Sequence, residues 1–368
     1  MGHGPSPPAA DLWPLPRPET ELPQRRRPTS ADVAAVAGVS RTTVSFVING
    51  RAGASIPIET RRRVQAAALE LGYHPHGAAS QLAGGRSLTL GLVLRQSAEQ
   101  VATDALLAET LHGLASAARA GGYRVLIEAM APGDGTYADL LRSHRTDGLV
   151  VSGPRADDDE LAGLVREGFP IVLQGSRPDL DTPSVDVDNR AGARRAVEHL
   201  LELGHRRIGC ITNAPLAYTA ATSRLAGYRE ALDAAGVPAD DRLVIEGAFD
   251  PGSGHLAMAE LLRRTDLSAV FVASDVVALG ALRGLRDAHL KVPRDVSVVG
   301  FDDIALAEHF DPPLTTVHLP ARGLGKAAGQ LLVERVAGRP VAQRTLLPTQ
   351  LVIRESTAAV GPGRSGGA

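Results

Sequence analysis

Residues 29–49 read TSADVAAVAGVSRTTVSFVIN, and this pattern predicts two short helices joined by a tight turn. Thr29 is a good cap for the first helix, and Asp32 lies in its first turn, near the positive end of the helix dipole. Gly38 supplies the positive φ angle that ends this helix, and Ser40 caps the second helix. The pair has the form of a helix-turn-helix, and its second helix has the right size for a DNA major groove.

The same spacing also fits two helices that merely pack together, so the charge of the surrounding segment matters. Residues 25–87 contain nine Arg and three acidic residues, a net charge of +6, although the whole chain has a net charge of −2. A basic segment on an acidic chain is typical of a protein with one phosphate-binding end. A third helix is expected from about Glu59 to Leu71, where apolar residues recur at helical spacing.

The composition excludes several classes of protein. A chain of 368 residues with 44% hydrophobic residues predicts more than one globular domain. It has no run of about 18 apolar residues, so no transmembrane helix is expected. Residues 1–28 carry eight prolines and lack the apolar core of a signal peptide, so we expect a disordered tail and a cytoplasmic protein. The lone Cys210 lies in an apolar run and is interpreted as a core residue.

From Leu88 onward, short apolar runs alternate with longer amphipathic segments. This alternation predicts parallel sheets with helices on both faces, and its length exceeds one doubly wound domain. We therefore expect two lobes with a ligand cleft at the carboxyl ends of their strands. Polar residues that follow the apolar runs or open a neighbouring helix are the candidate ligand contacts: Gln174, Arg224, Ser274, Asp275, Asp302 and Asp303. Arg95 and Gln96 follow the first apolar run and make that lobe more polar.

The chain resembles the LacI/GalR family of bacterial repressors. The resemblance is carried by DVAAVAGVSRTTVSFVIN at residues 32–49 and ETRRRVQAAALELGYHPHGAASQLAGGRS at residues 59–87, and it extends to about residue 356. It implies a multidomain α plus α/β fold with a helix-turn-helix head, a hinge helix and a two-lobed effector domain like that of periplasmic binding proteins. The implied segments are the head at 29–73, the hinge helix at 74–87, one lobe at 88–187 with 319–346, the other lobe at 188–318 with 347–357, and disordered tails at 1–28 and 358–368.

The resemblance also implies which residues contact DNA. Arg41, Thr42 and Phe46 match positions that read bases, and Leu82 matches a leucine that wedges into the minor groove. Thr43, Ser45 and Asn49 are interpreted as phosphate contacts, although Ser45 is also suited to a local cap. The predicted DNA-binding residues are Thr29, Ser40, Arg41, Thr42, Thr43, Ser45, Phe46, Asn49, Tyr73, His76, Ala79 and Leu82.

The family match implies a set of effector contacts as well. Arg224 and Asp302 would hold ligand hydroxyls, and Phe249 would stack on the face of a sugar. Two of these assignments have structural alternatives, because Asp275 can cap the helix that it opens and Arg224 can pair with Glu230. The predicted effector-binding residues are Gln174, Arg224, Phe249, Ser274, Asp275 and Asp302.

These observations favour a sequence-specific transcriptional regulator, expected to be a repressor, that is controlled by a small molecule. The expected partners are a near-palindromic double-stranded DNA operator, a second copy of the chain and an effector, for which a sugar is the first choice. A purine- or other metabolite-responsive corepressor-type regulator is the alternative. A sugar-binding protein without DNA function fits the basic head less well. No motif with catalytic or metal-binding spacing is present, so no enzyme activity, metal, cofactor or membrane partner is expected.

Overall fold

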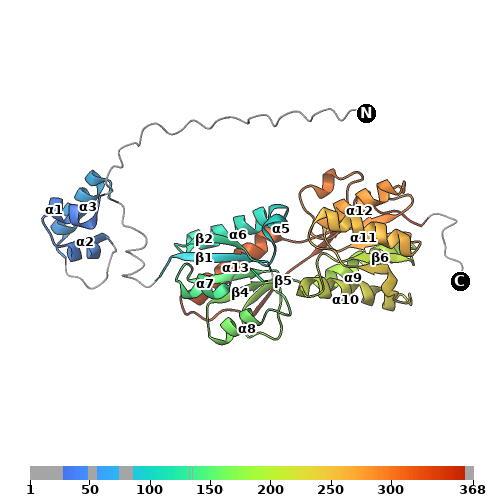
Figure 1. Ribbon diagram of the computed structural model, residues 1–368, viewed down its shortest axis with the longest axis horizontal. Coiled ribbons are helices and arrows are strands. Elements are labelled where there is room, and N and C mark those ends of the chain that lie inside the picture. Colours follow the sequence, from blue (N-terminus) through green and yellow to red (C-terminus); the bar gives the residue numbers. More distant parts are fainter. Residues whose placement is uncertain (1–27, 49–55, 74–85, 132, 135, 361–368) are drawn as a thin grey trace, which may run out of the picture. The chain divides into compact units, whose positions relative to one another are not determined.

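The computed structural model describes residues 28–48, 56–73, 86–131, 133–134 and 136–360. Its contacts divide the chain into two compact units, Met1–Gly85 and Arg86–Ala368 (Figure 1). The first unit is called the head below. The second unit contains two parallel sheets covered by helices, which form the two lobes that the sequence predicts, and a two-stranded ribbon.

The head contains the helices α1 (Ser30–Ala37), α2 (Arg41–Ile48) and α3 (Ile58–Leu71). Thr29 and Asp32 form a reciprocal cap on α1, in which the Thr29 amide donates to the Asp32 carboxylate at 2.7 Å. Gly38 ends α1 with a φ of 62°. The Thr43 amide donates to Ser40 Oγ at 3.1 Å, which caps α2. The predicted helix-turn-helix is therefore confirmed.

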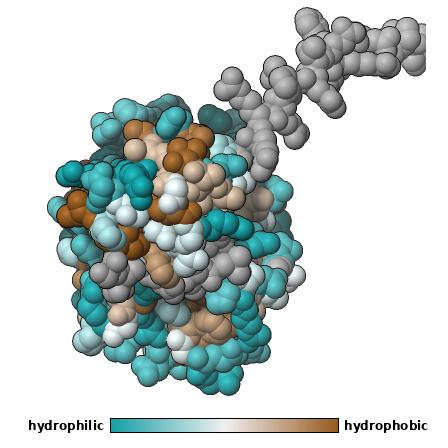
Figure 2. Space-filling view, turned by 90° about the vertical axis from the view of Figure 1, so that its left-hand side faces the viewer, coloured by the Kyte–Doolittle hydropathy of each residue, from teal (hydrophilic) through white to brown (hydrophobic). Residues whose placement is uncertain are grey.

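Small apolar side chains from all three helices form the core of the head. Val47 takes the buried position on α2, whereas Ile48, which also matches the apolar spacing, is only partly buried. Val36, Ile58 and Leu69 are exposed, and Figure 2 shows brown, hydrophobic patches between teal, hydrophilic ones on the surface that it faces. The buried core residues are Val33, Ala34, Ala37, Val44, Val47, Val64, Ala67 and Ala68.

No single helix among the described residues is long and apolar enough to span a membrane. The pair α1 and α2 passes that test by length and composition only when the two are taken together, and they are bent by 102° relative to each other.

The first lobe is built on a parallel sheet with the strand order β11-β5-β4-β3-β1-β2. Its strands are β1 (Thr89–Leu94), β2 (Arg124–Ala129), β3 (Gly148–Ser152), β4 (Ile171–Gln174), β5 (Ser184–Val187) and β11 (Arg344–Leu347). Its helices are α5 (Ala98–Ala102), α6 (Leu107–Ala120), α7 (Tyr137–Arg142), α8 (Asp159–Arg166) and α13 (Ala321–Val336). Strands β1, β3 and β4 are almost wholly buried, as expected for a sheet covered on both faces.

The second lobe repeats this plan with a parallel sheet in the order β7-β6-β8-β9. Its strands are β6 (Ile208–Ile211), β7 (Val244–Ile245), β8 (Ala269–Val272) and β9 (Ser297–Val299), and its helices are α9 (Asn189–Glu202), α10 (Thr219–Ala234), α11 (Pro251–Arg264) and α12 (Asp275–Asp287). Short 3-10 turns occur at Asp241–Leu243 and Ala307–His309. Cys210 is fully buried in β6, where burial raises the pKa of its thiol to about 12.

Three short stretches of chain connect the lobes. The first runs from β5 directly into α9. The other two contain β10 (Thr316–His318) and β12 (Gln350–Val352), which pair antiparallel in a two-stranded ribbon. Strand β10 leads into α13 of the first lobe, and β12 follows β11 back toward the second lobe. The ribbon therefore carries both returns of the chain between the lobes.

Glycines allow the paired helices of each lobe to touch through their backbones. A Cβ atom at Gly325 of α13 would overlap the carbonyl oxygen of Thr110 in α6. A Cβ atom at Gly280 of α12 would likewise overlap the carbonyl oxygen of Pro251 in α11. Such contacts leave no space for a larger side chain, so each helix pair is held in one arrangement.

Candidate effector cleft and DNA-binding head

A cavity of about 160 Å³ lies between the two lobes of the second unit. Both sheets direct the carboxyl ends of their strands toward it, which is where a doubly wound fold binds ligands. Five of the six predicted effector contacts line this one cavity, namely Gln174, Arg224, Phe249, Ser274 and Asp302. Asp275 is fully buried outside the lining.

Arg224 and Asp302 form a buried ion pair at the base of the cavity. Arg224 Nη1 lies 3.2 Å from Asp302 Oδ1 and also donates to the Ala273 carbonyl at 2.6 Å. Its Nε donates to Asn189 Oδ1 at 2.8 Å, and its guanidinium stacks over the Phe301 ring at 3.7 Å. Nη2 makes no hydrogen bond to a described residue, so its two N–H groups remain for a ligand. Glu230, the alternative partner suggested by the sequence, pairs with Arg190 instead.

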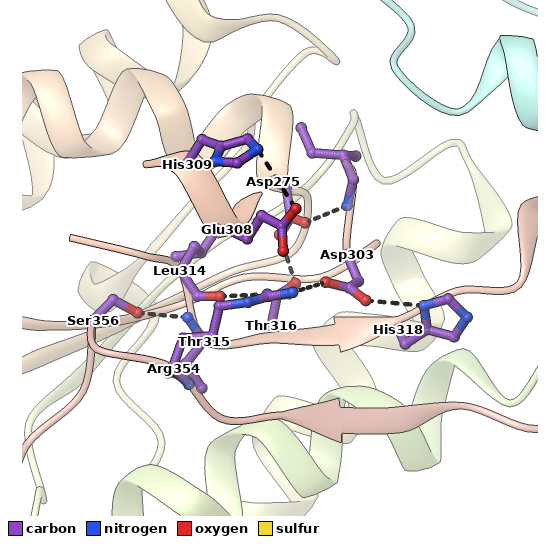
Figure 3. A network of polar contacts seen from close by, with 11 residues as sticks. Asp275, Asp303, Glu308, His309, Leu314, Thr315, Thr316, His318, Arg354 and Ser356 are labelled. Atoms are coloured by element: carbon purple, nitrogen blue, oxygen red, sulfur yellow. Dashed lines mark hydrogen bonds and ion pairs between the residues drawn. The ribbon is translucent and has the colours of Figure 1, made fainter. Parts of the chain in front are cut away.

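Asp302 and Asp303 lie in the segment after β9 and have an unusual backbone. Their φ angles are 117° and 54°, a region that non-glycine residues rarely adopt. Two side chains from the ribbon and the residues just after it hold this segment: His318 Nδ1 of β10 lies 3.0 Å from Asp303 Oδ2, and Arg354 Nη2, two residues after β12, donates to Asp303 Oδ1 at 2.7 Å (Figure 3). The backbone that presents Asp302 to the cavity is thus tied to the chain segments that join the lobes.

Asp275 is hydrogen-bonded to residues that follow this segment in the chain. Its Oδ2 accepts from the Ile304 amide at 3.0 Å, and its Oδ1 accepts from the Thr316 hydroxyl at 2.6 Å (Figure 3). Burial raises the pKa of its carboxyl group, and the neighbouring Asp302 adds to this shift. Because both oxygens are already bonded inside the protein, the structure does not bring Asp275 to the cavity as the sequence predicted. The structural alternative is not observed either: Ser274 is the N-cap of α12, and the Asp275 carboxylate accepts from Ile304 and Thr316 and not from an amide of the helix.

Phe249 lines the cavity, with a φ of 64° that is rare for an aromatic residue. Its amide donates to the Asn213 carbonyl at 2.9 Å, which fixes its position beside β6. The Tyr218 ring meets the Phe249 ring edge-on, with the ring centroids 4.9 Å apart. The two aromatic rings form an apolar wall suited to the face of a sugar or a base.

Tyr218 also belongs to a contact between the lobes that we call the interlobe clasp, formed by residues 154–156 and 217–219. The Ala156 amide donates to the Ala217 carbonyl at 2.8 Å, and the Thr219 amide donates to the Pro154 carbonyl at 3.3 Å. The Tyr218 hydroxyl donates to the Arg95 carbonyl of the first lobe, and the Arg155 guanidinium lies over the Tyr218 ring at 4.8 Å. A second contact across the cleft joins Gln100 Nε2 to the Ala248 carbonyl at 3.1 Å.

Sequence reasoning missed several polar residues of the cavity. Asn213 and Asp186 lie at the ends of β6 and β5, so the rule that identified Gln174 would also have found them. Asp104 lies in the loop between α5 and α6, and no sequence signal marks it. Gln96 does line the cavity, but Arg95 turns away from it and pairs with Asp158 at 3.3 Å.

Asp186 provides a test of this geometry that needs no ligand. Its Oδ1 accepts from the Val187 amide and from Asn189 Nδ2, whereas burial raises its pKa to about 6. Because the folded-state pKa lies above the unfolded value of about 3.9, ionisation of Asp186 destabilises the fold. The stability that the protonated carboxyl group contributes is therefore lost as the pH rises from about 4 through 6. A buried carboxylate kept at such a cost is typical of a functional site.

We expect Asp186→Asn to raise the free energy of unfolding of the lobes by about 2–3 kcal/mol at pH 7.5 and by only about 1 kcal/mol at pH 4.5. Urea unfolding of the full chain, followed by circular dichroism, measures both values. Asp181→Asn removes the same charge from an exposed position in the same lobe and should change stability by less than about 0.5 kcal/mol at either pH. An equal gain at both pH values would contradict the assignment.

The predicted DNA contacts of the head differ in how far they are exposed. Arg41 and Thr42 are exposed at the start of α2, and Ser45 and Phe46 are partly buried one turn later. Ser40 Oγ and Thr43 Oγ1 lie 2.9 Å apart, so these hydroxyls bond each other as well as capping the helix. Thr29 caps α1 on the exposed surface, and Tyr73 packs against the core after the end of α3. Asn49, His76, Ala79 and Leu82, with most of the predicted hinge, lie outside the described residues.

A three-helix head with an exposed second helix, followed by two α/β lobes around a polar cavity, defines a ligand-controlled DNA-binding regulator. Comparison with known families agrees. Residues 29–76 match the model of bacterial regulatory proteins of the lacI family, and residues 197–357 match that of the periplasmic binding protein-like domain.

Whole-length relatives show the same relationship. The HTH-type transcriptional regulator CelR of Thermobifida fusca is 40% identical over 90% of this chain and 99% of its own length. The HTH-type transcriptional repressor PurR of Vibrio atlanticus is 32% identical over 89% of this chain and 98% of its own. The chain therefore belongs to the LacI family. It is a DNA-binding transcriptional regulator with an effector-binding domain, and not an enzyme.

Solved structures cover both parts of the chain. The CelR–cellobiose complex matches with a TM-score of 0.69 and 38% identity over 90% of this chain and all of that one. The lac repressor dimer bound to operator and the anti-inducer ONPF matches with a TM-score of 0.78 and 32% identity over 91% of this chain and all of that one. The predicted fold class, a helix-turn-helix head with a two-lobed periplasmic-binding-protein-like domain, is confirmed.

Proposed function

We propose that this protein represses transcription from a near-palindromic operator and that a sugar bound between the lobes controls its affinity for that operator. The observation that carries the proposal is the cavity in which Arg224, Asp302 and Phe249 converge. A charged pair that offers free N–H groups beside an aromatic wall suits a ring that has polar edges and an apolar face. The complex of CelR with cellobiose supports the choice of a sugar.

The experiment is a mobility shift of the full chain on the DNA upstream of its own gene, repeated with a panel of sugars. We expect a specific shift that one sugar or a small group of related sugars releases. Unlabelled competitor DNA of unrelated sequence provides the control for specific binding. If no sugar altered the shift, the proposal of a DNA-binding regulator would stand and the proposal of a sugar effector would be wrong.

A purine base is the second candidate for the effector. PurR is among the relatives, and the edge-on pair of Tyr218 and Phe249 is as suitable for a planar base as for a sugar face. Adding adenine, guanine and hypoxanthine to the same mobility shift separates the two candidates. A purine that strengthens the shift would make the protein a corepressor-type regulator.

In the head, we propose that α2 lies in the major groove. Arg41 and Thr42 are exposed on its first turn, where a recognition helix reads base edges, and Phe46 follows one turn later. Thr29, Ser40, Thr43, Ser45 and Tyr73 would contact phosphates or shape the surface that does so, and the family likeness assigns Asn49, His76, Ala79 and the wedge Leu82 to the same interface.

Arg41 is the sharpest test of this assignment. We expect Arg41→Ala to weaken operator binding by about 1–3 kcal/mol and to relax the preference at one base-pair position in each half-site. Arg41→Lys keeps the charge and loses the two-pronged hydrogen bond, so it should lose the preference and retain the salt dependence. Binding titrations on operator variants at several salt concentrations measure both. A uniform loss on every operator would reassign Arg41 to a phosphate.

We propose that two copies act together, because two heads are needed for the two halves of a near-palindromic operator. The lac repressor was solved as a dimer on its operator, which supports this. The protein would work where the DNA is, in the cytoplasm. Residues 88–187 with 319–346 and residues 188–318 with 347–357 are the segments that we propose move as the two lobes.

A further inference from the structure

The cavity contains more hydrogen-bond acceptors than the protein itself satisfies. Three buried amide oxygens in its lining have no partner among the described residues: Gln96 Oε1, Gln174 Oε1 and Asn213 Oδ1. Asn213 is only 6% exposed, so water has little access to it. A buried acceptor without a donor is unfavourable, and a ligand that supplies donors removes this penalty.

Gln96 lies beside Asp104, and its side-chain hydrogen bond lowers the pKa of the Asp104 carboxyl group. A carboxylate accepts from the NH₂ group of an amide, which is consistent with the Gln96 Oε1 having no partner among the described residues. Gln174 Nε2 has a long contact of 3.5 Å to Thr110 Oγ1, and this amide is free to rotate. Gln96 therefore adds a buried acceptor that no described residue satisfies to the lining of the cavity.

The charged residues of the cavity also favour a ligand that donates hydrogen bonds. Among the described residues that line it, Arg224 is the one cation and is ion-paired with Asp302. No described ion pair includes Asp104 or Asp186, although the charges of Arg224 and Arg344 lower the pKa of Asp186. Asp104 also occupies the positive end of α6, because its Oδ1 accepts from the Leu106 amide at 2.9 Å. A helix N-terminus that would otherwise attract an anion is thus filled by the protein's own carboxylate. Burial raises the pKa of both Asp104 and Asp186, which reflects this lack of compensation.

We propose that the effector is a sugar without any anionic group, and that its hydroxyl or amino groups donate to Gln96, Asn213, Asp104 and Asp186. We expect phosphorylated sugars and sugar acids to bind poorly, because their negative charge would lie beside two carboxylates that form no ion pair. The inference rests on the proposed sugar and narrows it to neutral and amino sugars.

The experiment uses sets of sugars that differ only in charge: glucose, glucosamine and glucose 6-phosphate; ribose and ribose 5-phosphate; cellobiose and cellobionic acid. Thermal shift of the full chain identifies the set that binds, and calorimetry measures its members. We expect the neutral or amino member to bind and its anionic counterpart to bind about a hundredfold more weakly, the effect of a like charge at close range in a partly buried site.

Two variants assign the discrimination to the carboxylates. In Asp104→Asn/Asp186→Asn we expect the gap between neutral and anionic members to shrink to less than about tenfold. Asp181→Asn, which removes an exposed charge from the same lobe, should leave the gap unchanged. An anionic member that binds as tightly as its neutral counterpart would overturn the proposal, and so would a double variant with undiminished discrimination. The proposal would also be wrong if no member of any set bound. The operator mobility shift, measured on the same preparation, tests separately whether the protein binds DNA.

Discussion

Arg224→Ala is expected to weaken effector binding by at least about a hundredfold while the protein still binds its operator. The change removes the free Nη2 donors that face the cavity, and it leaves the carboxylate of Asp302 buried without its partner. Breaking a buried ion pair from one side is strongly destabilising, so the free energy of unfolding of the lobes should fall by about 3 kcal/mol. Operator binding should persist because the head is a separate compact unit.

Calorimetry with the sugar that releases the parent protein, together with a mobility shift, measures the two effects. Arg224→Lys retains a cation beside Asp302 and serves if the alanine variant fails to fold; we expect it to fold and still to lose at least about tenfold in effector affinity. Arg190→Ala is the matched control, since it removes an arginine from an exposed pair with Glu230 on the neighbouring helix. Unchanged effector affinity in both Arg224 variants would move the effector site elsewhere.

The second large effect is expected from locking the interlobe clasp. Ala156 and Ala217 are paired by a hydrogen bond across it, and residues opposed in this way have Cα atoms about 5.5 Å apart, within the range that a disulfide spans. In the oxidised double variant Ala156→Cys/Ala217→Cys, operator affinity should no longer respond to the effector. The disulfide would hold the lobes together, and we expect that the lobes must separate both for the effector to exchange and for the protein to change between its effector-bound and operator-bound conformations.

The reduced form of the same double variant should respond like the parent protein, and each single cysteine variant should respond under both conditions. Cys210 does not compete for the new disulfide, because its thiol is fully buried in β6. Mobility shifts with and without effector, before and after a reducing agent, make the comparison. A full effector response in the oxidised protein would show that the clasp does not open during regulation.

The sequence predicted the head more completely than the cleft. Caps such as Thr29 and turns such as Gly38 act over three or four residues, so their effect is visible in the local pattern. Gln174 and Ser274 were found because polar residues at the carboxyl ends of parallel strands collect at one edge. The place of Phe249 came only from the family resemblance.

What the pattern could not show was which polar groups satisfy one another. Asp275 stands next to Ser274 in the chain, yet its carboxylate is bonded to Thr316 and Ile304, which lie far along the sequence. Asp104 and Tyr218 reach the cavity from loops whose course depends on the packing of both lobes. Long-range hydrogen bonds decide such positions, and no local periodicity encodes them.

The touching backbones at Gly325 and Gly280 give the lobes a mechanical property. Because the paired helices cannot slide past each other, each lobe is expected to move as a rigid body. A change in the angle between the lobes must then occur at the three connecting segments. Arg86 donates to the Val336 carbonyl at the end of α13 at 2.8 Å, so the point at which the chain enters the first lobe travels with that lobe. A rotation of the first lobe about these connections would therefore move Arg86 together with the lobe.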